Sequence, residues 1–551
     1  MRTTIRIAIA SVVVAAFMAP AQAASAAPLL CGSEITTPGT TITLTEDLHC
    51  DARGIIVRAN NVTIDLAGYT MFGSGSTEYD EELGSAAGIA VLGATNTRIA
   101  GGTITGFANG MKVDHSNATD VQNIVIDGTN NFGMVLTDSN GIALSHTILT
   151  GPGHDGSGIT GIMGVNVTGF SAAYAVISHW PDSGIYMSPV AGFSLTYSSV
   201  TENAGEGISL WDLRGRIVLQ DSTFTENYDG VMLAHTKDSG SVEISSSTMN
   251  NNVQHGLYTI NVSNSRVINV TANHNGGEGI WMDSGRDWTY GIDIPFYANI
   301  QRSTTNGNRH SGISLSFAGR WWISGNHAEA NGDSGFAFYG GEAILTSNTA
   351  KDNGLDGFTW EPGSRGSSNG DVATHNDRHG VLLKNGGSNT VRLTSITATH
   401  NGSTGLTAES GIAKVQNGSY SYNASDGIRA SVGRVDAMRI TAYKNGNNGI
   451  AFLSGSTGSI DHVTSTKNGR YGVCVARGVR ITDVPSHVLS YNTLGPRGSV
   501  CAGLIFYPHL PNTTLPLPLP HRLPAIYGRR GGHSTRSASQ VSGLPIVRIG
   551  L

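Results

Sequence analysis

The feature that most constrains the fold of this chain is a repeat of about 23 residues. Each repeat opens with a glycine and continues with alternating apolar and polar residues, as in Ile208-Ser209-Leu210 and Ile313-Ser314-Leu315. Such alternation is typical of a strand with one buried face. One step, between Gly279 and Gly312, is longer than the others and marks an insertion. The aligned glycines are Gly88, Gly110, Gly133, Gly158, Gly184, Gly207, Gly230, Gly256, Gly279, Gly312, Gly335, Gly357, Gly380, Gly405, Gly427, Gly449 and Gly472.

A second repeated position holds asparagine, usually four residues before the glycine. Asparagine tolerates a left-handed backbone, and stacked asparagine side chains form hydrogen-bonded ladders between strands. We therefore interpret these asparagines as structural rather than catalytic. They are Asn203, Asn252, Asn275, Asn308, Asn331, Asn353, Asn376, Asn401, Asn423, Asn445 and Asn468.

The length and pattern of the repeat predict one coil of a parallel β-solenoid with about three short strands. The repeat is too short for a propeller blade, and it lacks the leucine spacing of a leucine-rich repeat and any helical period. Each coil of a solenoid packs only on its neighbours, so a chain of 551 residues can form one long domain. We predict an all-β solenoid of about 17–18 coils over residues 28–507.

Two appendages flank the predicted solenoid. Residues 1–27 contain two arginines, an apolar run and small-residue cleavage sites, which together predict a bacterial-type secretory signal peptide. The run is too short for a membrane span, and no other stretch is long and apolar enough for one. We expect a secreted, extracellular monomer with no transmembrane segment.

The second appendage, residues 508–551, contains seven of the seventeen prolines, five arginines and no acidic residue. This composition predicts an extended, disordered tail. The whole chain has a net charge of −6, so the positive tail and leader leave the body near −13. A body of this charge argues against general nucleic-acid binding.

The four cysteines fit an exported protein. Four cysteines allow three pairings. Proximity along the rod favours Cys31 with Cys50 and Cys474 with Cys501, so that each disulfide staples one end of the solenoid.

The glycine-led coils, the segment NNVTIDLAGYTMFGSG at 60–75 and the cysteine-closed ends resemble the right-handed parallel β-helix superfamily, which includes pectate-lyase-like enzymes. The resemblance covers residues 30–500 and implies the fold; it implies no single activity, because the superfamily contains lyases, epimerases, hydrolases and non-catalytic proteins. The polygalacturonase signatures and the Asp-Pro-His-Asp-type motif of alginate epimerases are absent from the sequence. The closest segment to the latter is KVDH at 112–115.

Residues two and four positions after each glycine should face outward and form columns along the solenoid. Most are small, but those of the central coils are aromatic or acidic, namely Tyr186, Trp211, Tyr258, Trp281, Asp283, Tyr339 and Glu361. A row of exposed aromatic rings suits a binding groove for sugars. The alternative is that these rings pack beneath a long loop.

The residue just before the glycine is ionisable on four consecutive coils: Glu206, Asp229, His255 and Glu278. Neighbouring coils place such groups about 5 Å apart. Acids that close repel each other, which raises the pKa of one of them and can produce a general acid. The alternative is a solvated turn column that happens to be charged.

The insertion at 281–303 lies beside these coils and carries Asp283, Arg286, Asp287, Trp288 and Tyr290. An aromatic loop of this length is more often functional than disordered. A second insertion, GSTEYDEELGS at 75–85, holds four acids and is a possible Ca²⁺ ligand set; no cofactor is otherwise expected.

Together these features predict that the protein binds an extracellular polysaccharide, most consistently an acidic glycan processed by lyase- or epimerase-type chemistry. That chemistry needs a base for the C5 proton of a uronic acid and a cation beside its carboxylate. A glycoside hydrolase with paired carboxylates and a non-catalytic glycan-binding or structural protein are the alternatives. The candidate catalytic residues are Asp229, His235, His255, Glu278, Asp283 and Arg286, and the candidate substrate-binding residues are Trp211, Lys237, Tyr258, Trp281, Trp288, Arg320 and Trp321.

Overall fold

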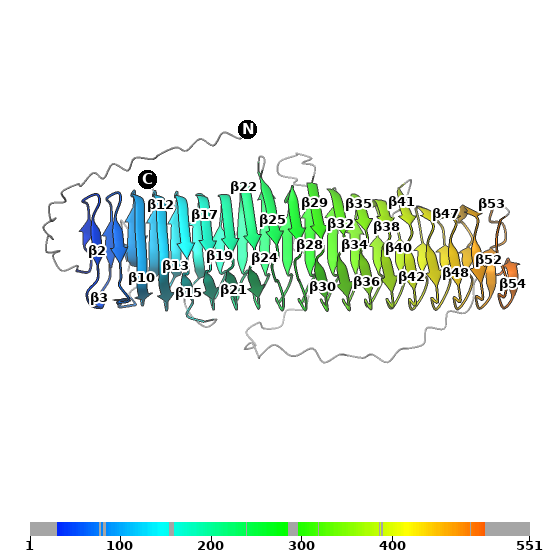
Figure 1. Cartoon of the computed structure of the whole chain (residues 1–551), viewed down its shortest axis with the longest axis horizontal. Helices are drawn as coiled ribbons and strands as arrows, with labels where there is room; N and C mark the ends of the chain where they lie inside the picture. Colours follow the sequence, from blue (N-terminus) through cyan, green and yellow to red (C-terminus); the bar gives the residue numbers. More distant parts are fainter. Residues whose placement is uncertain are drawn as a thin grey trace, which may run out of the picture. The chain divides into compact units, whose positions relative to one another are not determined.

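The computed structural model describes residues 30–501, except 76–78, 81–83, 154–158, 238–239, 285–295, 318, 385, 387–388 and 485. Within the described residues the chain forms a right-handed parallel β-solenoid of about 19 turns, without a helix (Figure 1). The predicted fold is confirmed. The solenoid is slightly longer than the repeat count, because the first aligned glycine is Gly54 rather than Gly88. The predicted signal peptide and tail lie outside the described residues.

Most coils contribute one strand to each of three parallel sheets, and successive coils pair in register; the coils of β24 and β26 join the third sheet only through the isolated bridges of Thr248 and Thr271. In most coils the first-sheet strand begins directly beside the repeated glycine. The second-sheet and third-sheet strands come next along the chain. A short antiparallel hairpin, β7 (Tyr79–Asp80) with β8 (Gly84–Ser85), stands apart from these sheets. No helix of the described chain has the length and apolar character needed to cross a membrane.

The first sheet contains β1 (Glu34–Ile35), β4 (Ile55–Val57), β9 (Ala87–Leu92), β11 (Asn109–Asp114), β13 (Phe132–Thr137), β16 (Thr160–Val165), β19 (Ile185–Met187), the first half of β22 (Ile208–Gln220), β24 (Val231–Thr236), β26 (Leu257–Ile260), β28 (Ile280–Ser284), β31 (Ile313–Phe317), β34 (Phe336–Tyr339), β37 (Phe358–Trp360), β40 (Val381–Leu383), β43 (Leu406–Ala408), β46 (Ile428–Ala430), β49 (Ile450–Phe452), β52 (Tyr471–Val475) and β54 (Gly495–Gly498).

The second sheet contains β2 (Thr41–Thr43), β5 (Thr63–Asp65), the first parts of β10 (Thr95–Thr105) and β12 (Asn117–Asp127), β14 (Asn140–Ser145), β17 (Val167–Ala173), β20 (Val190–Thr196), the second half of β22, β25 (Ser241–Ser245), β27 (Ser265–Ile268), β29 (Phe296–Gln301), β32 (Gly319–Ser324), β35 (Glu342–Thr346), β38 (Arg365–Asn369), β41 (Thr390–Thr394), β44 (Ile412–Gln416), β47 (Arg434–Met438), β50 (Thr457–Asp461) and β53 (Ile481–Val484).

The third sheet contains β3 (Leu48–Cys50), β6 (Thr70–Gly73), the ends of β10 and β12, β15 (Ile148–Thr150), β18 (Val176–Ser178), β21 (Ser199–Thr201), β23 (Thr223–Thr225), β30 (Thr304–Asn306), β33 (His327–Glu329), β36 (Thr349–Lys351), β39 (Val372–Thr374), β42 (Thr397–Thr399), β45 (Ser419–Ser421), β48 (Thr441–Tyr443) and β51 (Thr464–Thr466).

The glycine column exists because the coils approach each other too closely for a side chain. A Cβ atom added at Gly207 would lie 2.6 Å from the carbonyl oxygen of Gly230 and 2.8 Å from the side-chain nitrogen of Asn227. The alignment corrects one position of the repeat. The glycine that follows Gly133 in the column is Gly161 rather than Gly158, because Met134 pairs with Ile162; Gly158 lies outside the described residues.

The asparagine ladder is confirmed as a structural feature. The Asn331 side chain donates to the side-chain oxygen of Asn353 at 3.0 Å and to the backbone oxygen of Thr305 at 2.8 Å. Its own oxygen accepts from the backbone and side chain of Asn308. The ladder runs without interruption from Asn203 to Asn492 and includes Asn227, which stands only three residues before its glycine.

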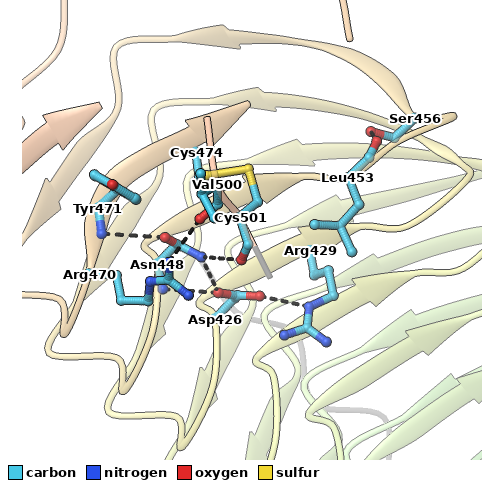
Figure 2. The surroundings of a disulfide bond; sticks show 10 residues. All are labelled: Asp426, Arg429, Asn448, Leu453, Ser456, Arg470, Tyr471, Cys474, Val500 and Cys501. Carbon is cyan, nitrogen blue, oxygen red and sulfur yellow. Dashed lines mark hydrogen bonds and ion pairs between the residues drawn. A yellow bond between two sulfur atoms is a disulfide. The ribbon is translucent and has the colours of Figure 1, made fainter. Parts of the chain in front are cut away.

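Both predicted disulfides are present, Cys31–Cys50 near the N-terminus and Cys474–Cys501 near the C-terminus. Figure 2 shows that Cys501 lies against Cys474 of β52, where the side chain of Asn448 donates to the Cys501 carbonyl at 3.3 Å. Arg470 donates to the neighbouring carbonyl of Val500 at 2.9 Å. The disulfide therefore fixes the end of the described chain against the last coils.

Candidate functional site

Three ionisable side chains stand in line just before the first-sheet strands β24, β26 and β28. Asp229 accepts a hydrogen bond of 2.7 Å from the backbone N–H of His255. The Nδ1 atom of His255 in turn lies 3.0 Å from a carboxylate oxygen of Glu278 and 3.1 Å from the backbone nitrogen of Glu278. With a proton on Nδ1, His255 donates to the Glu278 carboxylate and leaves Nε2 free to accept a proton from a ligand; without that proton, Nδ1 accepts from the Glu278 amide instead.

Asp229 is almost fully buried, and its pKa is raised to about 6. Burial is the main cause; the nearby charge of His255 opposes the shift, and Glu206 and Glu278 add to it. The sequence predicts a raised pKa in this column, but the main cause is desolvation of Asp229 rather than repulsion between the acids. Near neutral pH this carboxyl therefore titrates in the range useful for proton transfer.

Two aromatic rings of the first sheet border this line. Tyr258 and Trp281 pair in register, and their rings stack at 4.6 Å with an angle of 22° between the planes. The edge of the His255 ring meets Trp281 at 4.9 Å. Burial, followed by the charges of Asp283, Asp229 and Glu278, raises the pKa of Tyr258, so its hydroxyl stays protonated and able to donate.

A hollow of about 1030 Å³ begins at Glu278 and Trp281 and extends over the next three coils. This volume is at the upper end of the usual range for ligand pockets. It is lined by two small residues, Ser314 and Ser316, because the coil after β28 carries serines at the positions that Trp281 and Asp283 occupy one coil earlier. We call this feature the central hollow; its walls include Glu278, Trp281, Arg320, Tyr339, Glu361 and Arg365.

The central hollow has cations on one wall. Arg320 is half-exposed and lies 3.6 Å from Glu342, while its guanidinium lies 5.2 Å from the ring of Trp322. Arg365 follows two coils later and pairs in register with Glu342. Both arginines line the central hollow, which the His255–Glu278 pair adjoins.

The candidate residues predicted from the sequence form two groups, which lie at opposite ends of the first-sheet strands. His235 and Lys237 lie at the far end of β24, beside Asp212 at 3.8 Å and 3.5 Å. About six residues of extended chain, roughly 20 Å, separate His235 from Asp229. His235 and Lys237 therefore do not join Asp229 and His255 in one site.

Two aromatic candidates lie elsewhere than expected. Trp321 is only 2% exposed and packs in the core, so the expectation that it binds a substrate is wrong; its neighbour Trp322 faces outward, because alternation along β32 places odd positions inside. Trp211 donates to Ser209 and meets His235 at 5.6 Å, so it belongs to the group at the far end of the strands.

Three further candidates belong to the long insertion. Asp283, at its start in β28, lies close enough to Tyr258 to raise the pKa of that hydroxyl. Arg286 and Trp288 lie outside the described residues, as does the middle of the insertion. The chain resumes at Phe296, which lines the central hollow. The side chains of the acidic segment at 75–85 are likewise outside the described part, so the Ca²⁺ expectation there stays a prediction.

The sequence did not single out Arg365, and it noted Tyr339 and Glu361 only as members of a column. Burial raises the pKa of Tyr339, and the charges of Glu361 and Glu278 add to the shift. Lys384 lies 3.5 Å from Glu361. An alignment of the second-sheet strands would have revealed Arg365, since Arg320, Glu342 and Arg365 occupy one column.

The residue just before the repeated glycine has a structural role in other coils as well. Asp356 accepts from the backbone N–H of His379 at 3.0 Å, and Asp426 accepts from that of Asn448 at 2.9 Å, just as Asp229 accepts from His255. Burial lowers the pKa of His379 to about 3, so this histidine stays neutral. What distinguishes His255 from His379 is its contact with a carboxylate at the edge of the central hollow.

A group of possible metal ligands occurs far from the hollow. Asp114, His115 and Asp138 lie at the ends of β11 and β13, with His115 at 2.9 Å and 3.6 Å from the two carboxylates. The histidine contacts account for the proximity of the three groups. This is where the segment KVDH at 112–115 lies, and it is several coils away from the central hollow.

Comparisons with known proteins agree on the fold. The family model described as right handed beta helix region matches residues 160–289 and 289–396. No curated protein matches the sequence. Among solved structures, the A-module of the mannuronan C-5 epimerase AlgE6 of Azotobacter vinelandii is 11% identical, with 57% of this chain and 91% of that chain covered and a TM-score of 0.38.

Two further solved structures are similar at the same level. The periplasmic alginate epimerase AlgG is 14% identical, with 64% of this chain and 76% of that chain covered and a TM-score of 0.30. The polygalacturonase from Erwinia carotovora ssp. carotovora is 14% identical, with 56% and 94% covered and a TM-score of 0.28. At these scores the structural likenesses carry no functional argument. The stacked coils and the family model, which matches less than half of the chain, agree on the right-handed parallel β-helix fold and indicate no particular activity subfamily.

Proposed function

We propose that this protein works outside the cytoplasm and binds and modifies an acidic polysaccharide in the central hollow. The observation that carries the proposal is the His255–Glu278 pair, 3.0 Å apart, at the edge of a hollow that two arginines also line. A base and a cation facing one cavity are what removal of a proton beside a carboxylate requires. Two disulfides support an oxidising compartment outside the cytoplasm.

In this proposal Arg320 and Arg365 hold the carboxylate of a uronic acid, and His255 or Glu278 takes the proton from the adjacent C5 carbon. The electron pair left on C5 is delocalised into the carboxylate, where the arginines stabilise the added charge. In a lyase the pair then expels the glycosidic oxygen at C4, which takes a proton from a donor such as Tyr339. In an epimerase C5 is reprotonated from its opposite face.

Hydrolysis by paired carboxylates is less well supported. Retaining and inverting glycosidases hold their carboxyl groups about 5–9.5 Å apart with the scissile bond between them. Asp229 and Glu278 lie two coils apart, roughly 10 Å, and His255 occupies the space between them with contacts to both. Glu278 and Glu361 lie three coils apart and at opposite ends of their strands, so more than about 14 Å separates them. Glu206 and Asp229 stand on neighbouring coils, but neither lines the central hollow.

A screen of acidic and neutral polysaccharides with the purified full chain tests the proposal. Ultraviolet absorbance from an unsaturated uronate identifies a lyase, and deuterium incorporation at C5 in heavy water without such absorbance identifies an epimerase. Either result supports the proposal. New reducing ends without absorbance would indicate the hydrolase, and binding without chemical change would indicate a non-catalytic glycan-binding protein; both would contradict the proposed chemistry.

A further inference from the structure

A second surface with a regular chemical pattern lies at the turns that follow the third-sheet strands β39, β42, β45, β48 and β51. At one turn position of successive coils the residues are His375, His400, Tyr422, Lys444 and Lys467, all exposed. All five have a left-handed backbone, with φ between 52° and 59°. This conformation costs free energy for residues other than glycine. A shared backbone conformation nevertheless directs the five side chains the same way.

The aromatic members of this surface form a rigid stack. The rings of His375 and His400 are parallel at 5.0 Å, and those of His400 and Tyr422 are parallel at 4.8 Å. Tyr443, one residue before Lys444, turns its ring edge to Tyr422 at 5.4 Å. We call these six residues, His375, His400, Tyr422, Tyr443, Lys444 and Lys467, the basic ridge.

The ammonium groups of the basic ridge are held by the tyrosines. The Lys444 ammonium lies 5.5 Å from the ring of Tyr422 and 5.4 Å from that of Tyr443. The Lys467 ammonium lies 5.5 Å from the Tyr443 ring and 3.4 Å from its hydroxyl oxygen. Burial acts to raise the pKa of Tyr443, but the hydrogen bond from Lys467 and the charge of Lys444 lower it overall.

The basic ridge has no acids beside its lysines. The third-sheet strands and following turns at 397–403, 419–425, 441–447 and 464–470, all within the described chain, contain no aspartate or glutamate; the equivalent segment at the His375 end of the ridge, 372–378, contains Asp377. The body as a whole is strongly acidic. Two neighbouring cations without a nearby acid repel each other, and an oxyanion between them would relieve that repulsion.

The geometry of the stacked rings indicates which class of polymer the basic ridge could bind. Parallel rings about 5 Å apart cover one another's faces, so only ring edges, the tyrosine hydroxyls and the ammonium groups are presented outward. Single-stranded nucleic acid binds through bases that stack on open ring faces, which the basic ridge does not offer. Hydroxyl and ammonium donors suit carboxylate or phosphate oxygens instead.

We propose that the basic ridge is a second binding surface, which holds a polyanionic glycan through its carboxylate or phosphate groups. A row of donors spaced by the coil repeat, about 4.8 Å, suits a polymer rather than a single ion. This surface lies on the third-sheet turns, whereas the central hollow is lined by residues of the first and second sheets, and the proposal stands independently of the chemistry in the hollow.

Binding of the full chain to four probes tests this proposal: polygalacturonate, poly(glycerol phosphate), neutral dextran and single-stranded oligodeoxythymidylate. We expect at least one anionic glycan polymer to bind at low salt and dextran not to bind. The two polymers distinguish a carboxylate ligand from a phosphate ligand. The double substitution Lys444→Gln with Lys467→Gln should raise the Kd about tenfold or more and reduce its dependence on salt.

Lys414→Gln is the matched control, because Lys414 is an exposed lysine of β44 on the second sheet; it should change the Kd less than about twofold. The proposal is overturned if neither anionic polymer binds, if the double variant binds as tightly as the parent, or if the oligodeoxythymidylate binds more tightly than both polymers.

Discussion

His255 Nδ1 lies 3.0 Å from a carboxylate oxygen of Glu278 and 3.1 Å from the backbone nitrogen of the same residue. Depending on the tautomer, this nitrogen donates to the carboxylate, which then orients the imidazole, or accepts from the backbone amide. The structural and the chemical use of this position can therefore be separated by substitution.

We expect His255→Asn to lower turnover of the polysaccharide that the screen identifies by about 10² or more, because a general base contributes at least this much. The fold should tolerate the change, since Asn448 occupies the equivalent position in another coil and its side-chain oxygen accepts from Tyr471 at 3.3 Å. Turnover and melting temperature are the measurements. The matched control is His379→Asn, which changes the same position away from the hollow; equal losses in the two variants would contradict the assignment.

Trp281→Ala should weaken substrate binding more than it lowers the maximal rate, because the ring forms a wall of the hollow and stacks on Tyr258. A rise in KM of about tenfold is expected, equivalent to about 1.4 kcal/mol. Tyr174→Ala removes a similarly stacked ring, 51% exposed, from a distant part of the solenoid and should leave KM unchanged. An unaltered KM in the Trp281 variant would argue against the hollow as the binding site.

Asp229 should make stability depend on pH. Its pKa is raised from 3.8 to about 6 in the folded protein, so the neutral form is favoured by folding and stability is lost as the pH rises from about 4 through 6. The loss is at most about 3 kcal/mol. Asp229→Asn keeps an acceptor for the His255 amide and cannot ionise. Its melting temperature, relative to the parent, should therefore rise between pH 4 and pH 7; a constant difference across this range would show that Asp229 does not titrate there.

Asn331→Ala should destabilise the central coils by several kcal/mol, because it leaves the buried partners of four hydrogen bonds unsatisfied. Denaturant unfolding measures the change. Asn447→Ala removes a partly buried amide outside the ladder, bonded to Ser425, and should cost less than about 1 kcal/mol. Similar losses in both variants would mean that the ladder has no special role in stability.

Cys501→Ser should loosen the segment after β53, including β54, from its neighbouring strand β52. Closing the loop of 27 residues between Cys474 and Cys501 is worth about 3–4 kcal/mol on the chain-entropy account. We expect faster amide exchange in residues 484–501 and a lower midpoint of unfolding. The protein tested should also carry Cys474→Ser, so that no free thiol remains; unchanged exchange would show that Asn448 and Arg470 suffice to hold this segment.

Much of the fold was predictable from the sequence because a solenoid is encoded locally. The regular spacing of Gly207 and Gly230 in the sequence indicates that one coil stacks directly on the next. Only glycine fits at this contact, because a Cβ atom would clash with the backbone of the next coil. The asparagine ladder and the two disulfides follow from the same periodicity, since residues at equal positions of neighbouring coils must meet. The alignment failed at Gly158 because a turn of different length shifted the local repeat to Gly161.

The candidate site was only partly predictable, because it depends on which side of each strand a residue takes and on which end of the strand it stands. His235 and His255 are equally good bases in the sequence, yet one lies at the end of a first-sheet strand and the other at the start of the next. Trp321 and Trp322 are adjacent, and only the phase of β32 decides that the first is core and the second surface.

The repeat by itself thus determined the solenoid, its register, its ladders and its stapled ends, because each of these follows from contacts between equivalent positions. Only the tertiary structure decided where a cavity forms. The central hollow exists because Ser314 and Ser316 follow Trp281 and Asp283 in the stack, and because the second sheet brings Arg320 and Arg365 to the same wall. The volume of such a cavity and the burial that raises the pKa of Asp229 arise from the packing of several coils and three sheets, which no single repeat contains.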